Sequence, residues 1–80
     1  MIDLSVLLVD DEEAFVDALA RRLGKRGFRV ATATTGDGAL QALDEGGATR
    51  TDVVILDVKM PGMDGLETLA LIKERHPLVE

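Results

Sequence analysis

Two short runs of purely apolar residues constrain the fold of this chain most. They are residues 6–9 (Val-Leu-Leu-Val) and residues 53–56 (Val-Val-Ile-Leu). A strand with no polar residue on either side is covered on both faces, which is typical of parallel sheets whose crossovers are helices. The two runs therefore predict two fully buried strands of an α/β protein, over residues 4–9 and 53–56.

The rest of the chain alternates between helical and strand patterns. Helices are predicted over residues 11–26, about 37–44 and 65 to about 75. A shorter, more polar strand over 28–33 fits a sheet edge, and Leu78-Val79 resembles the start of another strand. Each crossover is helical, so the sheet should be parallel with right-handed crossovers. We find no linker that would divide these 80 residues.

The helical segments also predict which side chains face the core. In the first helix the buried stripe begins at Phe15 or Val16, and both choices continue through Leu19 and Leu23. Gly27 is a suitable C-terminal stop, and Asp64 with Glu67 has the spacing of a capping box for the third helix. The inward residues expected in the second and third helices are Ala39, Leu40, Leu43, Leu66, Leu69, Ala70 and Ile72.

Composition excludes several classes of protein. The formal net charge of −6 argues against nucleic-acid binding by this segment, because a duplex favours a basic face. No apolar stretch is long enough to cross a bilayer, and the N-terminus lacks the basic start of a signal peptide. The absence of cysteine excludes disulfides and thiolate metal sites. We therefore expect a cytoplasmic protein that contacts neither membrane nor nucleic acid.

Both apolar runs end on carboxylates. Asp10 and Asp11 follow the first run, and Asp57 follows the second. If the two strands are neighbours, the three acids converge at one edge of the sheet, where open parallel sheets bind ligands. Clustered carboxylates repel unless a cation neutralises them, and Mg²⁺ prefers oxygen ligands. Beside such an ion, a carboxylate can act as a nucleophile toward phosphorus. The alternative for Asp11 is that it only caps the following helix.

These residues resemble the receiver domain of two-component response regulators. The resemblance rests on Val6-Leu7-Leu8-Val9-Asp10-Asp11-Glu12, on residues 33–40, and above all on residues 54–65, and it covers essentially the whole chain. It implies a flavodoxin-like three-layer α/β sandwich with strand order 2-1-3 in the part present. It further implies that Asp57 accepts a phosphoryl group from a histidine kinase. The implied Mg²⁺ ligands are Asp57, Asp11, Asp10 through water, and the backbone carbonyl of Lys59.

The chain also departs from the family pattern. Receivers have five βα units in strand order 2-1-3-4-5, whereas residues 1–80 correspond to the N-terminal part, up to the threshold of the fourth strand. The family's switch Ser/Thr and its phosphate-pairing Lys have no counterpart among these residues. We therefore expect impaired phosphoryl acceptance. We also expect a homo-oligomer, because the third strand would be an exposed edge and a second copy could cover it.

Two other functions compete with the receiver interpretation. One is a dimerising interaction fragment without phosphotransfer. The other is a Mg²⁺-dependent phosphatase with an aspartyl-phosphate intermediate. Such phosphatases carry a second Asp two residues after the nucleophile, and Lys59 occupies that position here. We therefore favour a signalling acceptor over a multiple-turnover enzyme.

Overall fold

The computed structural model describes residues 4–45, 51–57 and 65–80, and in these ranges all six predicted elements are present. Their ends lie within two residues of the predicted ones. The predicted cap Asp64 lies outside the described residues. The elements are β1 Ser5–Val9, α1 Glu13–Lys25, β2 Arg29–Ala33, α2 Gly36–Asp44, β3 Val53–Leu56 and α3 Gly65–Arg75.

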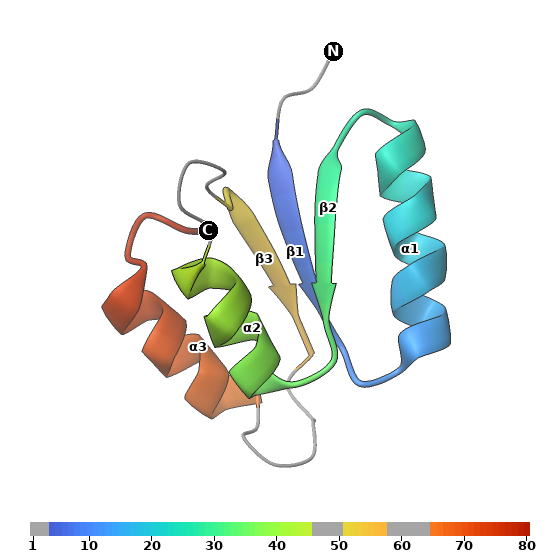
Figure 1. Ribbon diagram of the computed structural model, residues 1–80. Coiled ribbons are helices and arrows are strands. Elements are labelled where there is room, and N and C mark those ends of the chain that lie inside the picture. Colours follow the sequence, from blue (N-terminus) through green and yellow to red (C-terminus); the bar gives the residue numbers. More distant parts are fainter. Residues whose placement is uncertain (1–3, 46–50, 58–64) are drawn as a thin grey trace.

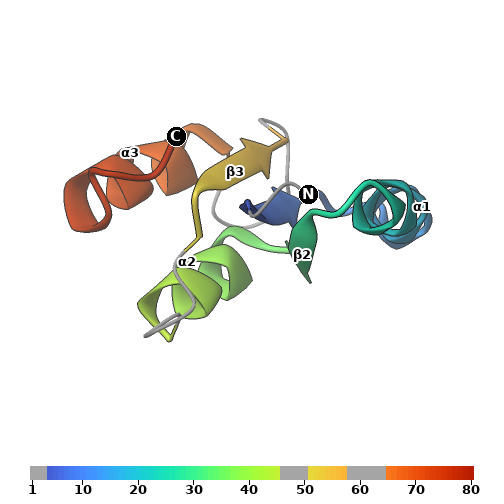
Figure 2. The same cartoon turned by 90° about the horizontal axis from the view of Figure 1, so that it is seen from above.

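The three strands form one parallel sheet of order β2-β1-β3, as expected (Figure 1). Leu8 of β1 lies opposite Thr32 of β2 and Ile55 of β3. Figure 2 shows α1 on one face of the sheet and both α2 and α3 on the other. Because the strands are parallel, their carboxyl ends all lie along one edge of the sheet. We call this edge the C-terminal rim and the opposite edge the N-terminal rim.

Each face of the sheet has its own hydrophobic cluster, because alternate residues of a strand point to opposite faces. Leu7 and Val9 of β1 pack with α2 and α3, whereas Val6 and Leu8 pack with α1. All five residues of β1 are buried, so the prediction of a fully buried strand is correct for the first apolar run. The buried members on the α2 and α3 side are Leu7, Val9, Ala39, Leu40, Leu43 and Ile72.

The predicted core faces of the helices are confirmed for α1 and α2 but not for most of α3. In α1 the stripe begins at Val16, and Phe15 is 53% exposed. In α3 the buried residues are Gly65, Thr68 and Ile72. Leu66, Leu69 and Ala70, which we expected to be buried, are exposed instead. The reason is that α3 contacts the core through one side only, and the 65-68-72 stripe occupies that side.

The second apolar run differs from the prediction of full burial. β3 lies at the sheet edge, its residues are mostly half-buried, and Ile55 is 49% exposed. Full burial would require cover on both faces, and the α1 side of β3 has little.

The expected strand start at Leu78-Val79 is not found, since no strand follows α3 among the described residues. Pro77 and Leu78 form a turn, and Leu78 is 79% exposed. The backbone N–H of Glu80 then donates to the carbonyl of Asp52 at 3.0 Å, and the Glu80 carbonyl accepts from the Val54 N–H at 2.9 Å. These two bonds have the pattern of a parallel ladder around Val53. Part of the outer edge of β3 is thereby paired within the chain.

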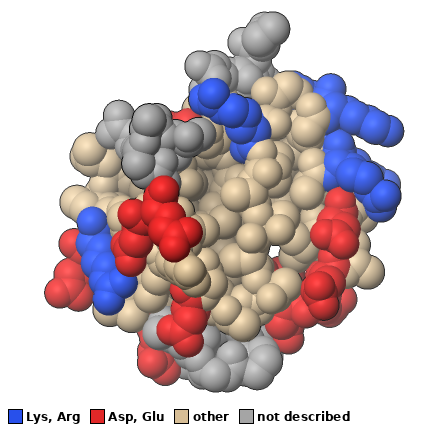
Figure 3. Space-filling view, in the orientation of Figure 1, with Lys and Arg blue, Asp and Glu red and all other residues tan. Residues whose placement is uncertain are grey.

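Charged side chains are distributed unevenly along α1. Its first turn carries Glu13, and its last turn carries Arg22 and Lys25. Figure 3 shows the corresponding separation of red and blue surface at the two ends of this helix. This order complements the helix dipole. It also makes the C-terminal rim the more acidic end of the molecule on this side.

Candidate metal centre

The hydrogen-bond ladder of the sheet sets the positions of the predicted site residues. The N–H of Asp57 donates to the carbonyl of Val9 at 2.9 Å, and the N–H of Asp10 donates to the carbonyl of Ala33 at 3.2 Å. The parallel pairing thus continues one residue past the ends of β1 and β3. Asp10 and Asp57 consequently stand next to each other on neighbouring strands.

The structure brings three of the predicted site residues together. Asp10, Asp11 and Asp57 each offer a carboxylate oxygen, and these atoms all lie within 4.8 Å of one another. Asp10 and Asp57 are half-buried and Asp11 is exposed, so the group opens to solvent. The backbone carbonyl of Lys59, the fourth predicted ligand, lies outside the described residues.

Asp10 is held in place by its own loop. Its Oδ1 accepts the backbone N–H of Glu12 at 3.0 Å, just before α1 begins. This bond fixes the Asp10 carboxylate beside the start of α1. The N-cap position of α1 is Glu12, and it makes no side-chain capping bond. The alternative interpretation of Asp11 as the cap of this helix is therefore wrong.

Three carboxylates at this spacing match the donor set of a hard divalent cation. Mg²⁺ takes oxygen ligands at about 2.0–2.1 Å and usually keeps several waters. An open group with one exposed carboxylate leaves room for those waters or for a phosphoryl oxygen. The residues present therefore fit a magnesium ion, and the ion would offset the mutual repulsion of the acids.

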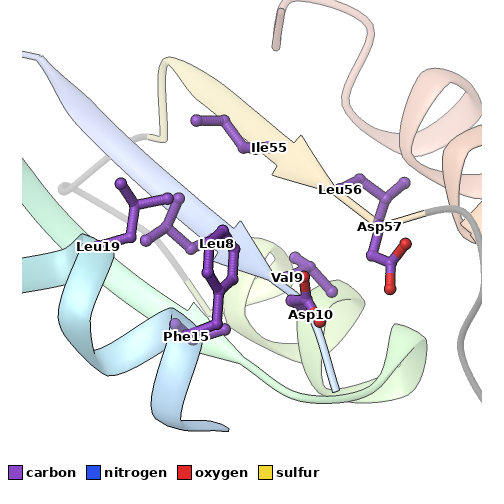
Figure 4. Close-up of a pocket in the computed structure, with 9 residues that line it drawn as sticks. Leu8, Val9, Asp10, Phe15, Leu19, Ile55, Leu56 and Asp57 are labelled. Carbon is purple, nitrogen blue, oxygen red and sulfur yellow. The ribbon is translucent and has the colours of Figure 1, made fainter. Parts of the chain in front are cut away.

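An apolar hollow adjoins the acids, and no pattern in the sequence indicates it. It has a volume of about 150 Å³ and lies between α1 and β3 (Figure 4). Sequence reasoning missed it because Ile55 was expected to be buried. Its walls are Leu8, Val9, Asp10, Phe15, Val16, Leu19, Ile55, Leu56 and Asp57.

The fold and the site together define a class: a flavodoxin-like α/β protein with a cluster of carboxylates at the carboxyl ends of adjacent parallel strands. The model of the response regulator receiver domain matches residues 6–80. The chain therefore belongs to the response regulator receiver domain family of two-component systems.

Among curated proteins, the chain is similar to the transcriptional regulatory protein AfsQ1 of Streptomyces coelicolor, with 40% identity over 74 residues. It is 42% identical over 71 residues to the sensory transduction protein RegX3 of Mycobacterium tuberculosis. These alignments cover 92% and 89% of this chain, but 32% and 30% of the relatives. The chain thus spans about a third of the length of these proteins.

Solved structures agree with this assignment. The response regulator TrrA of Thermotoga maritima in complex with Mg²⁺-BeF is 34% identical, with a TM-score of 0.79 over 92% of this chain and 62% of that one. A complex of the histidine kinase ThkA with TrrA contains a chain that is 32% identical, with a TM-score of 0.83. That match covers 96% of this chain and 64% of the other. Receiver-type neighbours therefore extend over nearly all of the chain described here.

Within the described ranges, α1 is the longest helix at 13 residues, and no helix there has the length and apolarity needed to span a bilayer.

Proposed function

We propose that this chain accepts a phosphoryl group from a histidine kinase on Asp57, in a reaction that depends on Mg²⁺. The observation that carries the proposal is the convergence of the Asp10, Asp11 and Asp57 carboxylate oxygens within 4.8 Å. A carboxylate oxygen of Asp57 attacks the phosphorus of a phosphohistidine. The P–N bond breaks, the imidazole leaves with the electron pair and takes up a proton, and an acyl phosphate forms.

The roles of the site residues follow from their exposure and bonding. Asp11, which is exposed, is proposed as a direct metal ligand, and Asp10, with Oδ1 bound to the Glu12 N–H, as a ligand through water. Asp57 and the Lys59 carbonyl complete the proposed set. When bound, Mg²⁺ supplies positive charge against the phosphoryl oxygens. The chain's own part is to hold Asp57 in line for attack through the ladder bond to Val9.

The proposed partner is a histidine kinase. The kinase ThkA forms a complex with the regulator TrrA, whose structure is similar to this chain, and we extend that kind of partner to this chain. The proposal includes a cytoplasmic location, no contact of these residues with nucleic acid or membrane, and a second copy of the chain beside β3. Because each Asp57 accepts one group, the chain is a signalling acceptor rather than a multiple-turnover enzyme.

Phosphoryl acceptance by these 80 residues alone should be slow. The switch Ser/Thr and the phosphate-pairing Lys that the family resemblance implies have no counterpart among residues 1–80. Residues 1–80 would still position Asp57 for attack, and a bound Mg²⁺ would still screen the charge of the phosphoryl group.

Intact-mass spectrometry tests the proposal. The chain is incubated with Mg²⁺ and acetyl phosphate, and the matched control is Asp57→Asn, which keeps size and removes the nucleophile. We expect the wild type to gain the mass of one phosphoryl group, with no gain in the variant or with Mg²⁺ removed. Catalytic turnover of phosphate esters would instead indicate a phosphatase. The absence of both an adduct and Mg²⁺ binding would leave an interaction module.

A further inference from the structure

We propose that Thr34 is a positioning residue of the magnesium site, whose hydroxyl oxygen accepts a hydrogen from the water that joins Asp10 to the ion. The inference rests on the proposed function, because it deepens the description of the same metal site. It adds a third strand to that site, since Asp10 and Asp57 follow β1 and β3 whereas Thr34 follows β2. Thr34 acts on the ion only through the water and through Asp10.

The sheet register places Thr34 beside Asp10. Val9 and Ala33 are register partners at the ends of β1 and β2, and the N–H of Asp10 donates to the carbonyl of Ala33 at 3.2 Å. Asp10 and Thr34 each come one residue after these partners, so both stand at the C-terminal rim. Backbones of neighbouring strands lie about 4.8 Å apart. This spacing leaves room for one water between two short polar side chains.

Alternation along the strands directs the two side chains to the same face of the sheet. Val6 and Leu8 of β1 and Val30 of β2 pack with α1. Asp10 continues the row of Val6 and Leu8, and Thr34 continues the row of Val30, because every second residue of a strand shares a face. The acids and the Thr34 hydroxyl therefore belong to one side of the rim.

Thr34 and Thr35 are adjacent but differ in their bonding. Thr35 Oγ1 accepts the N–H of Gly38 at 2.9 Å and caps α2. Thr34 is exposed, and its hydroxyl has no hydrogen-bond partner among the described residues. The fold thus uses the hydroxyl of Thr35 to start a helix and makes no such use of the hydroxyl of Thr34.

The bonding of Asp10 explains why a second acceptor matters. Asp10 Oδ1 accepts the Glu12 N–H at 3.0 Å, and the Asp10 side chain makes no other hydrogen bond within the described ranges. A water bound to Mg²⁺ gives a lone pair to the ion and presents two hydrogens. Asp10 accepts one of them, and Thr34 Oγ1, which has two lone pairs, accepts the other. The water is then fixed by three partners.

The expected size of the effect follows from the exposure of the site. Groups that support metal ligands typically change metal affinity by about 10–100-fold. Thr34 is exposed and Asp10 is half-buried, so bulk water competes for the same hydrogen bond. We therefore expect a smaller factor, about three- to tenfold.

Isothermal titration calorimetry with Mg²⁺ on the 80-residue chain tests the inference. Thr34→Val has nearly the same shape but no hydroxyl, and its dissociation constant for Mg²⁺ should rise about three- to tenfold. Thr34→Ser keeps the hydroxyl and should restore the wild-type value within about twofold. Urea denaturation without Mg²⁺ should give Thr34→Val the wild-type midpoint, because the hydroxyl makes no bond within the described part of the fold.

Thr35→Val is the matched control, one residue further along. It removes the acceptor of the Gly38 N–H, so the urea midpoint should fall. Its Mg²⁺ affinity should stay within about twofold of the wild type, and circular dichroism verifies that the variant is folded at the temperature of the titration.

Equal Mg²⁺ affinity of the wild type and Thr34→Val, or a Thr34→Ser chain as weak as Thr34→Val, would overturn the inference. If either result came with a phosphoryl adduct on Asp57, the proposed function would stand. Weakening by Thr34→Val in a chain that forms no acyl phosphate would instead support this inference and refute phosphoryl acceptance alone. A wild type that binds no Mg²⁺ would refute both.

Discussion

The two rims of the sheet use their acidic residues differently. Asp52 lies at the N-terminal rim, and the three clustered acids lie at the C-terminal rim. Asp52 Oδ2 accepts the backbone N–H of Ser5 at 2.9 Å, and the Asp52 N–H donates back to the Ser5 carbonyl. Its carboxylate is used to join β1 to the start of β3. At the other rim, Asp10, Asp11 and Asp57 converge instead on one another.

The difference separates acids whose carboxylates join elements of the fold from acids whose carboxylates gather at one point that is open to solvent. Asp44 belongs to the first kind as well, because its two oxygens contact Arg75 Nη1 at 3.2 Å and His76 Nε2 at 2.8 Å and tie the end of α2 to the end of α3. An acid of the first kind should matter for stability and not for metal binding. An acid of the second kind should show the reverse pattern.

The largest effect is expected from Asp11→Asn. Removal of the exposed carboxylate takes away a direct ligand, so Mg²⁺ affinity should fall by about 10–100-fold or more, the range seen even for groups that only support ligands. Isothermal titration calorimetry measures this affinity. The free energy of unfolding without Mg²⁺ should stay the same or rise slightly, because a source of repulsion is gone. A clear fall in the free energy of unfolding would contradict the distinction between the acids of the two rims.

Asp52→Ala should give the opposite pattern. The N–H of Ser5, a buried residue, would lose its acceptor. We expect the free energy of unfolding to fall by about 1 kcal/mol, the lower end of the range for an unpaired group, because Asp52 is only half-buried. Urea denaturation measures it. Mg²⁺ affinity should not change, and Asp52→Asn, which keeps an acceptor oxygen, should cost less.

The turn into β2 extends the same comparison, since backbone hydrogen bonds rather than a carboxylate close it at the N-terminal rim. Gly27 has φ of 97°, and the Phe28 N–H donates to the Leu23 carbonyl at 3.2 Å to close the end of α1. Gly27→Ala should lower the free energy of unfolding by about 1 kcal/mol, because a side chain is strained in this conformation. Chemical denaturation should show the loss, and Mg²⁺ titration should show no change.

The smallest effect is expected at Gly24, three residues earlier. It lies within α1, and a methyl group there would meet no atom within 4 Å. Gly24→Ala should raise the free energy of unfolding by about 0.5–1 kcal/mol, since alanine loses less conformational freedom in a helix. A thermal melt that shows destabilisation would contradict this account of the helix end.

Much of the fold could be predicted because periodicity and helix-ending residues are local signals. The apolar run 6–9 specified β1, and Gly27 marked the end of α1. The convergence of the acids followed from adjacency of two parallel strands. The sequence could not show which of two similar faces of α3 packs against the core. Thr68 is fully buried whereas Leu69 is 44% exposed, because α3 touches the sheet through the 65-68-72 stripe.

The second source of error in the predictions was the position of β3 at the edge of the sheet. Four apolar residues in β3 predict burial on both faces, but burial depends on what covers a strand, and Ile55 has little cover on the α1 side. The alternative that Asp11 caps α1 also failed. The N-cap residue is Glu12, which makes no side-chain capping bond, and the Glu12 N–H donates to Asp10 instead.

The most direct test of the central claim is an NMR titration of the isotope-labelled chain with Mg²⁺. We predict that the amide signals of Asp10, Asp11 and Asp57 shift together and saturate at one ion per chain, while those of Ser5 and Asp52 at the other rim stay in place. Shifts spread evenly over all exposed acids, or no saturable shift at these three residues, would contradict a magnesium site at the C-terminal rim.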